Sequence, residues 1–403
     1  MIKKKLSPWP FFSRSDAKKL KEILLSGNVN YWTGEECRNF EKEFATFADT
    51  KYAIALANGT VALDLAFYGL GIGSGDEVVV TSRTFIASIS SIINAGATPV
   101  FVDISANSQN IDPKSIKKAI TSRTKAIVCV HLAGWPCEMD EIMRLAEKNN
   151  LFVIEDCAQA HGAKYKGRSV GSIGHVGCWS FCQDKIMSTG GEGGMVTTDN
   201  KLLWKKMWAY KDHSKSYDAV YKKKHPPGFR WVHESFGTNW RMTELQGALG
   251  RLQLIKMPNW TKIRNSHQKK IWDTASRLNG LRVPHFKCES CNGCDKSNKC
   301  IHAGYKCYLF VEPEKLYDGW NRDRIIESIN DPSTPCFSGS CSEVYLEKAF
   351  KNTNFQPNER LPVAKELGEN ALMFLIHPTI TKNEINQICT TISNVMGKAA
   401  KQN

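Results

Sequence analysis

The sequence predicts an α/β fold with a mostly parallel sheet covered by helices on both faces, and three observations support this prediction. Apolar, β-branched runs alternate with helical stretches from about residue 50 to residue 155. These runs are apolar throughout, which is typical of strands buried on both faces. The chain of 403 residues has 42% hydrophobic and 23% charged residues, which are globular values and leave room for two domains.

The first half of the chain provides the elements of this sheet. The expected strands are short and apolar, at 51–56, 77–81, 98–102, 126–131 and 151–154. The helices expected between them lie at 60–70, 85–95 and 138–148. In such sheets ligands gather at the carboxyl ends of the strands, so functional side chains are expected just after these strands.

The regular pattern stops at 211–237, a stretch rich in Lys, His, Tyr and Pro that predicts a long loop of functional or mobile character. A helix is expected from Met242 towards Lys256, with Pro258 interrupting or kinking it. The composition changes after about residue 260, so we predict one domain at 1–255 and a second at 256–403. The second should carry strands at 308–311 and 372–376 and a closing helix at 383–396.

The net charge of +14 favours anionic ligands in general. The basic residues are spread along the chain, which favours a solvated surface over a nucleic-acid groove, so no nucleic-acid partner is expected. No apolar run approaches the length of a membrane span, and no apolar segment follows the basic residues Met1–Lys5. The protein is therefore expected to have no membrane partner and to be cytoplasmic.

Two residues stand out as candidates for chemistry. Asp156 follows an apolar strand, so its carboxylate is either an ion-pair partner or a group directed at a ligand. Lys185 follows a second strand end and precedes the glycine-rich turn 190–194, where glycine allows close backbone approach or positive φ. A lysine in such a dry pocket can lose its proton and form a Schiff base with a carbonyl.

Two helix starts fit an anionic group. The segment Asn58-Gly59-Thr60 leads into one predicted helix, and Asn239 precedes another. Backbone N–H groups and the helix dipole at such a start favour a phosphate. Ordinary helix caps have the same appearance, so Thr60 and Asn239 are either phosphate contacts or caps.

These motifs resemble the sugar aminotransferases of the DegT/DnrJ/EryC1/StrS family, which are pyridoxal-phosphate (PLP) enzymes of fold type I. The matching segments are 41–44, 58–63, 75–78, 84–87, 96–103, 155–163, 180–185, 190–194, 239–250 and 375–378. The resemblance implies a large domain of three layers, α/β/α, with a mostly parallel sheet, followed by a smaller C-terminal α+β domain.

The resemblance also implies roles around the cofactor ring. Lys185 would form the internal aldimine with PLP and carry the proton between substrate and cofactor carbons. Asp156 would pair with the pyridine nitrogen, which keeps the ring electron-withdrawing. Gln159 would bond the ring hydroxyl oxygen, and Phe85 would stack on the ring face.

The implied phosphate site consists of Gly59, Thr60 and Ser180. Asn239 would reach the phosphate of the cofactor in the partner subunit. This last role implies a homodimer in which both chains contribute to each active site.

The implied reaction moves an amino group from L-glutamate to a nucleotide-linked keto sugar, in amino-sugar and surface-glycan (O-antigen) biosynthesis. Glu192 in the glycine turn resembles relatives that act at C4, although the pair Gly190-Gly191 adds a glycine that many relatives lack. Amination of a keto-cyclitol is an alternative. Two further alternatives are a non-catalytic PLP-binding regulator and a sugar 3-dehydratase. Lys185 argues against the dehydratase, because the dehydratase relatives lack this lysine.

The loop 211–237 is the expected substrate-contact region, through Lys215, Tyr217, His225 and Arg230. An ordinary dimer-contact loop is the alternative interpretation.

A cysteine-rich insertion at about 286–307 departs from the family pattern. Cys288, Cys291, Cys294 and Cys300 have a spacing compatible with a four-cysteine structural zinc site. Cys307 opens a predicted strand and fits this set less well. Reduced thiols and an iron–sulfur cluster are the alternatives.

Overall fold

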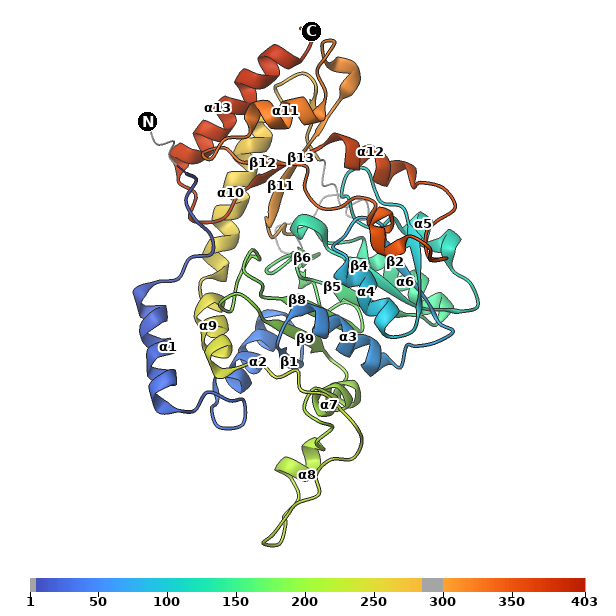
Figure 1. Cartoon of the computed structure of the whole chain (residues 1–403), viewed down its shortest axis with the longest axis vertical. Helices are drawn as coiled ribbons and strands as arrows, with labels where there is room; N and C mark the ends of the chain where they lie inside the picture. The colour runs from blue at the N-terminus through green and yellow to red at the C-terminus, as the bar shows by residue number, and fades with distance from the viewer. Residues whose placement is uncertain (1–4, 285–299, 403) are drawn as a thin grey trace.

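The computed structural model describes residues 5–284 and 300–402, and its largest element is a seven-stranded sheet (Figure 1). The strands, in their order across the sheet, are β1 (Tyr52–Leu56), β9 (Gly194–Thr198), β8 (Val176–Ser180), β5 (Phe152–Asp156), β4 (Thr124–Val130), β2 (Glu77–Thr81) and β3 (Thr98–Val102). β9 runs antiparallel to both of its neighbours, and the other adjacent pairs are parallel. The predicted mostly parallel sheet is confirmed.

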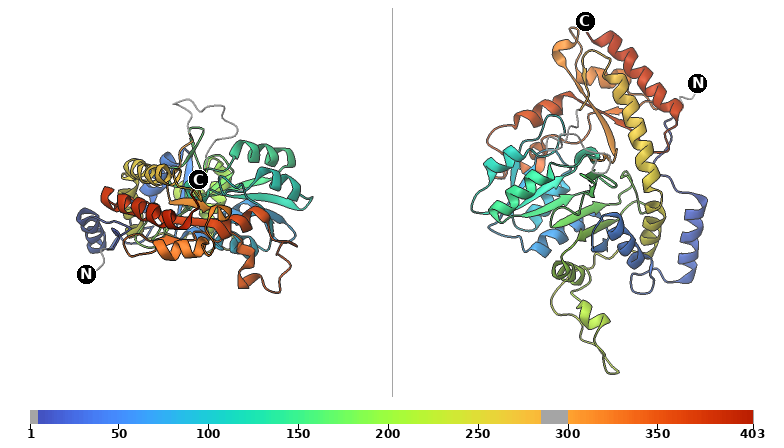
Figure 2. Two further views of the ribbon diagram at one scale, coloured as in Figure 1. Left: turned by 90° about the horizontal axis from the view of Figure 1, so that it is seen from above. Right: turned by 180° about the vertical axis from the view of Figure 1, so that it is seen from behind.

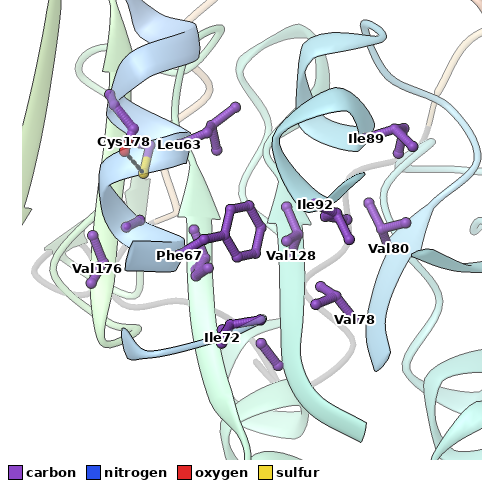
Figure 3. Packing of buried hydrophobic residues seen from close by; sticks show 14 of the residues in the cluster. Leu63, Phe67, Ile72, Val78, Val80, Ile89, Ile92, Val128, Val176 and Cys178 are labelled. Carbon is purple, nitrogen blue, oxygen red and sulfur yellow. Dashed lines mark hydrogen bonds between the residues drawn. The ribbon is translucent and has the colours of Figure 1, made fainter. Parts of the chain in front are cut away.

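Helices cover both faces of this sheet. One face carries α3 (Gly59–Leu70), α4 (Ala87–Asn94) and α7 (Lys201–Tyr210); the other carries α2 (Glu36–Phe47), α5 (Pro113–Ala119) and α6 (Met139–Asn149). Figure 3 shows Phe67 of α3 and Ile92 of α4 beside Val128 of β4. Ile127, the preceding residue of β4, packs in the opposite core with Ile142 of α6. Burial of successive residues on opposite faces explains why the strand is apolar throughout.

A second, four-stranded antiparallel sheet is formed after residue 280. Its strands, in order, are β10 (Leu281–Arg282), β11 (Lys306–Val311), β13 (Ala371–Leu375) and β12 (Cys336–Phe337). It shares a core with α10 (Met257–Ala275), α11 (Arg322–Ile329) and α13 (Lys382–Ala399), and α12 (Pro362–Asn370) packs nearby. The three-layer large unit and the smaller α+β unit agree with the predicted fold class.

The long helix α10 connects the two sheets (Figure 2). Met257 and Trp260 at its start pack with the core of the large sheet, whereas Ile271 and Ala275 at its end pack with the second sheet. α9 (Glu244–Leu254) ends just before it. Pro258 lies in the first turn of α10, where its missing N–H costs no hydrogen bond, so it marks the start of a new helix. The domain division at 255/256 falls between α9 and α10 and stays a prediction.

The loop expected at 211–237 is irregular except for the short helix α8 (Tyr217–Tyr221), and it projects away from the body of the protein (Figure 1). α1 (Arg14–Ser26) precedes α2 and lies along α9. Short elements complete the described chain: β6 (Lys164–Tyr165), β7 (Arg168–Ser169) and 3-10 turns at Leu132–Gly134, Pro313–Lys315, Val344–Leu346 and Lys348–Phe350. Over the described ranges, no helix has both the length and the apolar character required of a membrane span.

Candidate functional site

A cavity of about 780 Å³ lies where β4, β5 and β8 end. Val130, Asp156 and Ser180 are the last residues of these strands, and all three line it. The second sheet closes another side with Lys306 and Tyr308 of β11. The cavity lies at the carboxyl ends of the strands, where functional groups were expected. The wall formed by the second sheet was not expected.

One end of the cavity is suited to an anion. α3 begins there at Gly59, and a Cβ atom on Gly59 would lie only 2.6 Å from Cβ of Ser180. Glycine therefore allows the first turn of α3 to approach the end of β8 closely. The partial positive charge of the helix start and the Ser180 hydroxyl together favour a phosphate.

The alternative that Thr60 and Asn239 are helix caps is wrong. The side chain of Asn58 caps α3 by accepting a hydrogen bond from the backbone N–H of Val61, at 3.0 Å. α9 is capped by Thr243, whose hydroxyl accepts from Gln246 N–H. Thr60 lines the cavity, and its side chain is left for a ligand contact.

Asp156 is held in the cavity wall by two hydrogen bonds. Its Oδ2 accepts from the Ser88 hydroxyl at 2.8 Å, and its Oδ1 accepts from Ala158 N–H at 3.1 Å. Ser88 lies on α4, so this helix fixes the orientation of the carboxylate. A carboxylate held in this way can stabilise a positive charge on a bound ring nitrogen.

Gln159 also lines the cavity, three residues after Asp156. Its Oε1 accepts from Ala133 N–H at 2.8 Å, which leaves the side-chain amide nitrogen as the donor for a ligand oxygen.

Behind Asp156, Glu155 is fully buried on the opposite face of β5. It accepts hydrogen bonds from His131 Nε2 (3.0 Å), Gly171 N–H (2.8 Å) and Gly174 N–H (2.6 Å). Burial alone would raise the pKa of Glu155, but these bonds outweigh it and lower the pKa below its ordinary value. Cys137 N–H donates to Nδ1 of His131 at 3.0 Å, so the imidazole donates its Nε2 proton to Glu155.

Lys185 lines the same cavity and its side chain is 17% exposed. Its Nζ lies 3.8 Å from Oδ1 of Asp184 and 5.3 Å from the ring centroid of Tyr305. Gly190 and Gly191, with φ of 94° and 127°, form the turn that folds back so that Gln183 N–H bonds Gly191 O at 2.9 Å. Positive φ at both positions explains the two glycines of this turn.

Phe85 also lines the cavity and is 68% exposed, so one face of its ring is free for an aromatic ligand. The structure therefore brings seven of the predicted residues to one cavity: Gly59, Thr60, Phe85, Asp156, Gln159, Ser180 and Lys185.

Asn239 does not line the cavity of its own chain; it is exposed, and its backbone pairs with Asp212. None of the predicted substrate residues lines the cavity either. Lys215 pairs with Asp212 (Nζ to Oδ1 3.1 Å), and the ring of Tyr217 packs on Trp204 with centroids 4.9 Å apart. His225 Nε2 lies 2.6 Å from Ala219 O, and Arg230 is exposed on the projecting loop 211–237, the arm.

The zinc prediction falls mainly on Cys288, Cys291 and Cys294, which lie outside the described residues. Cys300 is described, and its Sγ accepts from Lys166 N–H at 3.4 Å. Cys307 is fully buried in β11 as part of the second core, in agreement with its poor fit to the cysteine set. The zinc site stays a prediction.

Sequence reasoning missed Tyr305, which immediately precedes β11, and Lys306, which begins it; both line the cavity that contains Lys185. The Tyr305 hydroxyl donates a hydrogen bond to Oδ2 of Asp184. It also missed Ser88, the partner of Asp156. No local pattern marks these residues, because tertiary packing brings them to the cavity: the second sheet carries Tyr305 and Lys306 there, and α4 carries Ser88.

The comparisons with known proteins agree with this geometry. Residues 12–393 match the DegT/DnrJ/EryC1/StrS aminotransferase family. The solved structure of an aminotransferase from Psychrobacter cryohalolentis is 60% identical, covers 97% of this chain and 99% of its own, and superposes with a TM-score of 0.93.

Two curated relatives extend this likeness. A GDP-perosamine synthase of Caulobacter vibrioides is 45% identical over 363 residues, 89% of each chain. A dTDP-3-amino-3,6-dideoxy-alpha-D-galactopyranose transaminase of Aneurinibacillus thermoaerophilus is 32% identical over 377 residues, 93% of each chain. The match spans nearly the whole chain and includes the strand ends and turns that form the cavity, and the protein belongs to the DegT/DnrJ/EryC1/StrS aminotransferase family.

Proposed function

We propose that the protein is a PLP-dependent aminotransferase that moves an amino group from L-glutamate to C4 of a nucleotide-linked keto sugar, in amino-sugar and surface-glycan biosynthesis. The observation that carries this proposal is the meeting of Lys185, Asp156 and the first turn of α3 in one cavity. The family and the names of its sugar-modifying members support the substrate class.

The residues of the cavity fit PLP. Gly59, Thr60 and Ser180 provide an anion site that a side chain at position 59 would fill. Asp156, oriented by Ser88, would face the pyridine nitrogen, and the amide nitrogen of Gln159 would donate to the ring oxygen. The open face of Phe85 would stack on the ring.

When bound, PLP supplies a carbonyl that condenses with amines and a ring that withdraws electrons from the adjacent carbon. Lys185 Nζ provides the amine and then accepts and returns the proton that moves between the reacting carbons. Asp156 keeps a proton on the ring nitrogen. Because Asp156 is only 7% exposed, its charge acts with little screening by water.

Amination at C4 rests on Glu192, which lines the cavity and lies 3.7 Å from Sγ of Cys182 through its Oε1. The relatives carry different nucleotides and sugar positions in their names, so C4 is the proposal that the family pattern of the glycine turn supports. The excess positive charge of the chain is compatible with a diphosphate-bearing substrate.

We further propose a homodimer with shared active sites. Asn239 is exposed and does not line the described cavity of its own chain, and the neighbouring arm exposes large apolar side chains: Phe229 by 75%, Trp231 by 84% and Phe236 by 100%. Such a cluster is typical of a protein-contact surface. In the dimer, Asn239 and the arm residues Lys215, Tyr217, His225 and Arg230 would reach the partner's cavity.

The test uses Lys185→Ala, with Lys201→Ala as a matched control because Lys201 is exposed on α7. Purified protein loaded with PLP is incubated with L-glutamate and a panel of nucleotide keto sugars, and the products are identified by mass spectrometry. We expect Lys201→Ala to match the wild type and Lys185→Ala to lose both turnover and covalent cofactor attachment. Turnover by Lys185→Ala would contradict the proposal, and amination of free cyclitols alone would change the substrate class.

A further inference from the structure

A second lysine lines the cavity near Lys185. Lys306, the first residue of β11, lines the cavity beside Tyr305. Its Nζ lies 4.7 Å from the ring centroid of Tyr305, and Nζ of Lys185 lies 5.3 Å from the same centroid. Both amines therefore lie near one aromatic ring, although Lys185 belongs to the turn after β8 and Lys306 to β11 of the second sheet.

Apart from the ring of Tyr305, the ammonium group of Lys306 has no polar partner among the described residues. Over residues 5–284 and 300–402, its Nζ makes no hydrogen bond or ion pair, and Lys185 and Lys306 are the only cationic residues that line the cavity. The nearby carboxylate of Asp184 already accepts the Tyr305 hydroxyl. An ammonium group left unpaired in a partly buried position is costly unless an anion joins it.

Two cationic groups, Arg264 and Lys185, act on the charge of Lys306. Arg264, buried behind the cavity wall, finds no acceptor for Nε or Nη2 among the described residues. Burial lowers the pKa of Lys306 to about 8; Asp184 opposes this shift, whereas Arg264 and Lys185 add to it. A bound anion would relieve this repulsion.

We propose that Lys306 binds the α-carboxylate of the amino donor, and of the keto acid it becomes, next to the amine of Lys185. This inference rests on the proposed transamination. The α-carboxylate is attached to the carbon that bears the reacting nitrogen, so it must lie near Lys185. The diphosphate of a nucleotide sugar is attached across the sugar ring from C4 and therefore lies farther away.

The test compares Lys306→Met, which keeps length and loses charge, with Lys306→Arg, which keeps charge. Lys125→Met is the matched control, because Lys125 lies near the start of β4 and is exposed outside the cavity. Calorimetry measures binding of 2-oxoglutarate to each holoenzyme, and stopped-flow absorbance measures the half-reactions with glutamate and with the keto sugar separately.

We expect Lys306→Met to weaken 2-oxoglutarate binding and raise the glutamate concentration for half-saturation by about tenfold to a hundredfold, which is the usual effect of losing a charged hydrogen bond. The keto-sugar half-reaction and the amount of bound PLP should stay at wild-type levels. Lys306→Arg should keep most of the affinity, and Lys125→Met should keep all of it.

Three outcomes would overturn the inference: unchanged 2-oxoglutarate affinity in Lys306→Met, a loss confined to the nucleotide sugar, or equal losses in Lys306→Met and Lys306→Arg. The second outcome would assign Lys306 to the diphosphate. If the wild type aminates no keto sugar, the proposed function fails separately, because 2-oxoglutarate binding still reports on Lys306.

The pH dependence of binding gives a further readout. Lys306 loses its charge as pH rises through about 8, so 2-oxoglutarate affinity should fall in that range. The ligand has no amine that titrates there. Lys306→Arg should remove this fall, because a guanidinium keeps its charge. Persistence of the same fall in Lys306→Arg would contradict the role of Lys306.

Discussion

The hydroxyl of Tyr305 donates a hydrogen bond to Asp184, the residue immediately before Lys185. Tyr305 immediately precedes the first strand residue of β11, whereas Asp184 belongs to the turn after β8. This bond therefore ties the second sheet to the segment that carries the reactive amine.

Tyr305→Phe keeps the ring that both lysines approach and removes this bond. We expect a loss of about 1 kcal/mol in the free energy of unfolding, since a hydrogen bond to a charged, partly exposed group contributes on that order. We also expect a lower kcat with unchanged PLP content, because Lys185 is held less firmly. Urea denaturation and steady-state kinetics measure the two effects. Tyr317→Phe is the control, because the Tyr317 ring is exposed; it should change neither the free energy of unfolding nor kcat.

The buried carboxylate of Glu155 organises the segment 171–174 behind the cavity. Glu155→Gln would place an NH₂ group against the donors at one of the two oxygens, either His131 and Gly171 or Ile173 and Gly174, so we expect a loss of about 3 kcal/mol or more in the free energy of unfolding. Urea denaturation measures it, and Glu147→Gln on the exposed side of α6 is the control. Equal stability of the two variants would show that Glu155 is not needed as an anion.

Comparison of the wild type with Glu155→Gln also tests how pH affects stability. The pKa of Glu155 in the folded protein lies below its ordinary value of 4.5, so ionisation of Glu155 stabilises the fold above pH 4.5. This stabilisation is lost as pH falls through the lower folded pKa. The difference in unfolding free energy between wild type and Glu155→Gln should therefore shrink on acidification. A difference that stays constant down to the acid transition would contradict this.

Gly59→Ala tests the anion site at the start of α3. The added Cβ would lie 2.6 Å from Cβ of Ser180, so the helix start must shift, and we expect PLP affinity to fall by about a hundredfold. Equilibrium dialysis measures this affinity. Gly397→Ala in α13 meets nothing within 4 Å and should leave PLP affinity unchanged while raising stability by about 1 kcal/mol.

Shared active sites predict complementation between two inactive variants. Lys185→Ala and Asn239→Ala would each lose activity as pure dimers, but a hybrid dimer has one site with both native residues. Mixing equal amounts after mild dissociation should restore about a quarter of wild-type turnover. Analytical ultracentrifugation confirms the dimers. Absence of recovery in verified hybrids would place both residues in the same chain's site.

Most of the large sheet was predictable, because most of its buried strands are short runs of apolar, β-branched residues. The bounds of β2 (Glu77–Thr81) and β3 (Thr98–Val102) are those predicted, since turn residues flank both strands sharply. Phe85 and Ile86 were expected to be helical, but α4 begins at Ala87. The short helix α8 was missed, because aromatic packing of Tyr217 on Trp204 and Trp208 stabilises it more than any helical pattern of its own.

The cavity was predictable only where its residues follow strands of the large sheet. Asp156 and Lys185 lie at such positions, and their chemistry could be inferred from neighbours in the chain. Lys306 is separated from Lys185 by more than a hundred residues, and no spacing rule connects them. Its place depends on how α10 positions the second sheet, which is a property of tertiary packing.

The alternation of side chains along β5 has an evolutionary consequence. Glu155 and Asp156 are adjacent acids with different roles. Glu155 binds the buried segment at 171–174, and Asp156 lines the cavity. Inserting or deleting one residue within Phe152–Asp156 would exchange the faces to which the two acids point. We therefore expect length changes among descendants of this gene to be absent from this strand, and to accumulate in residues 222–237 of the projecting arm instead.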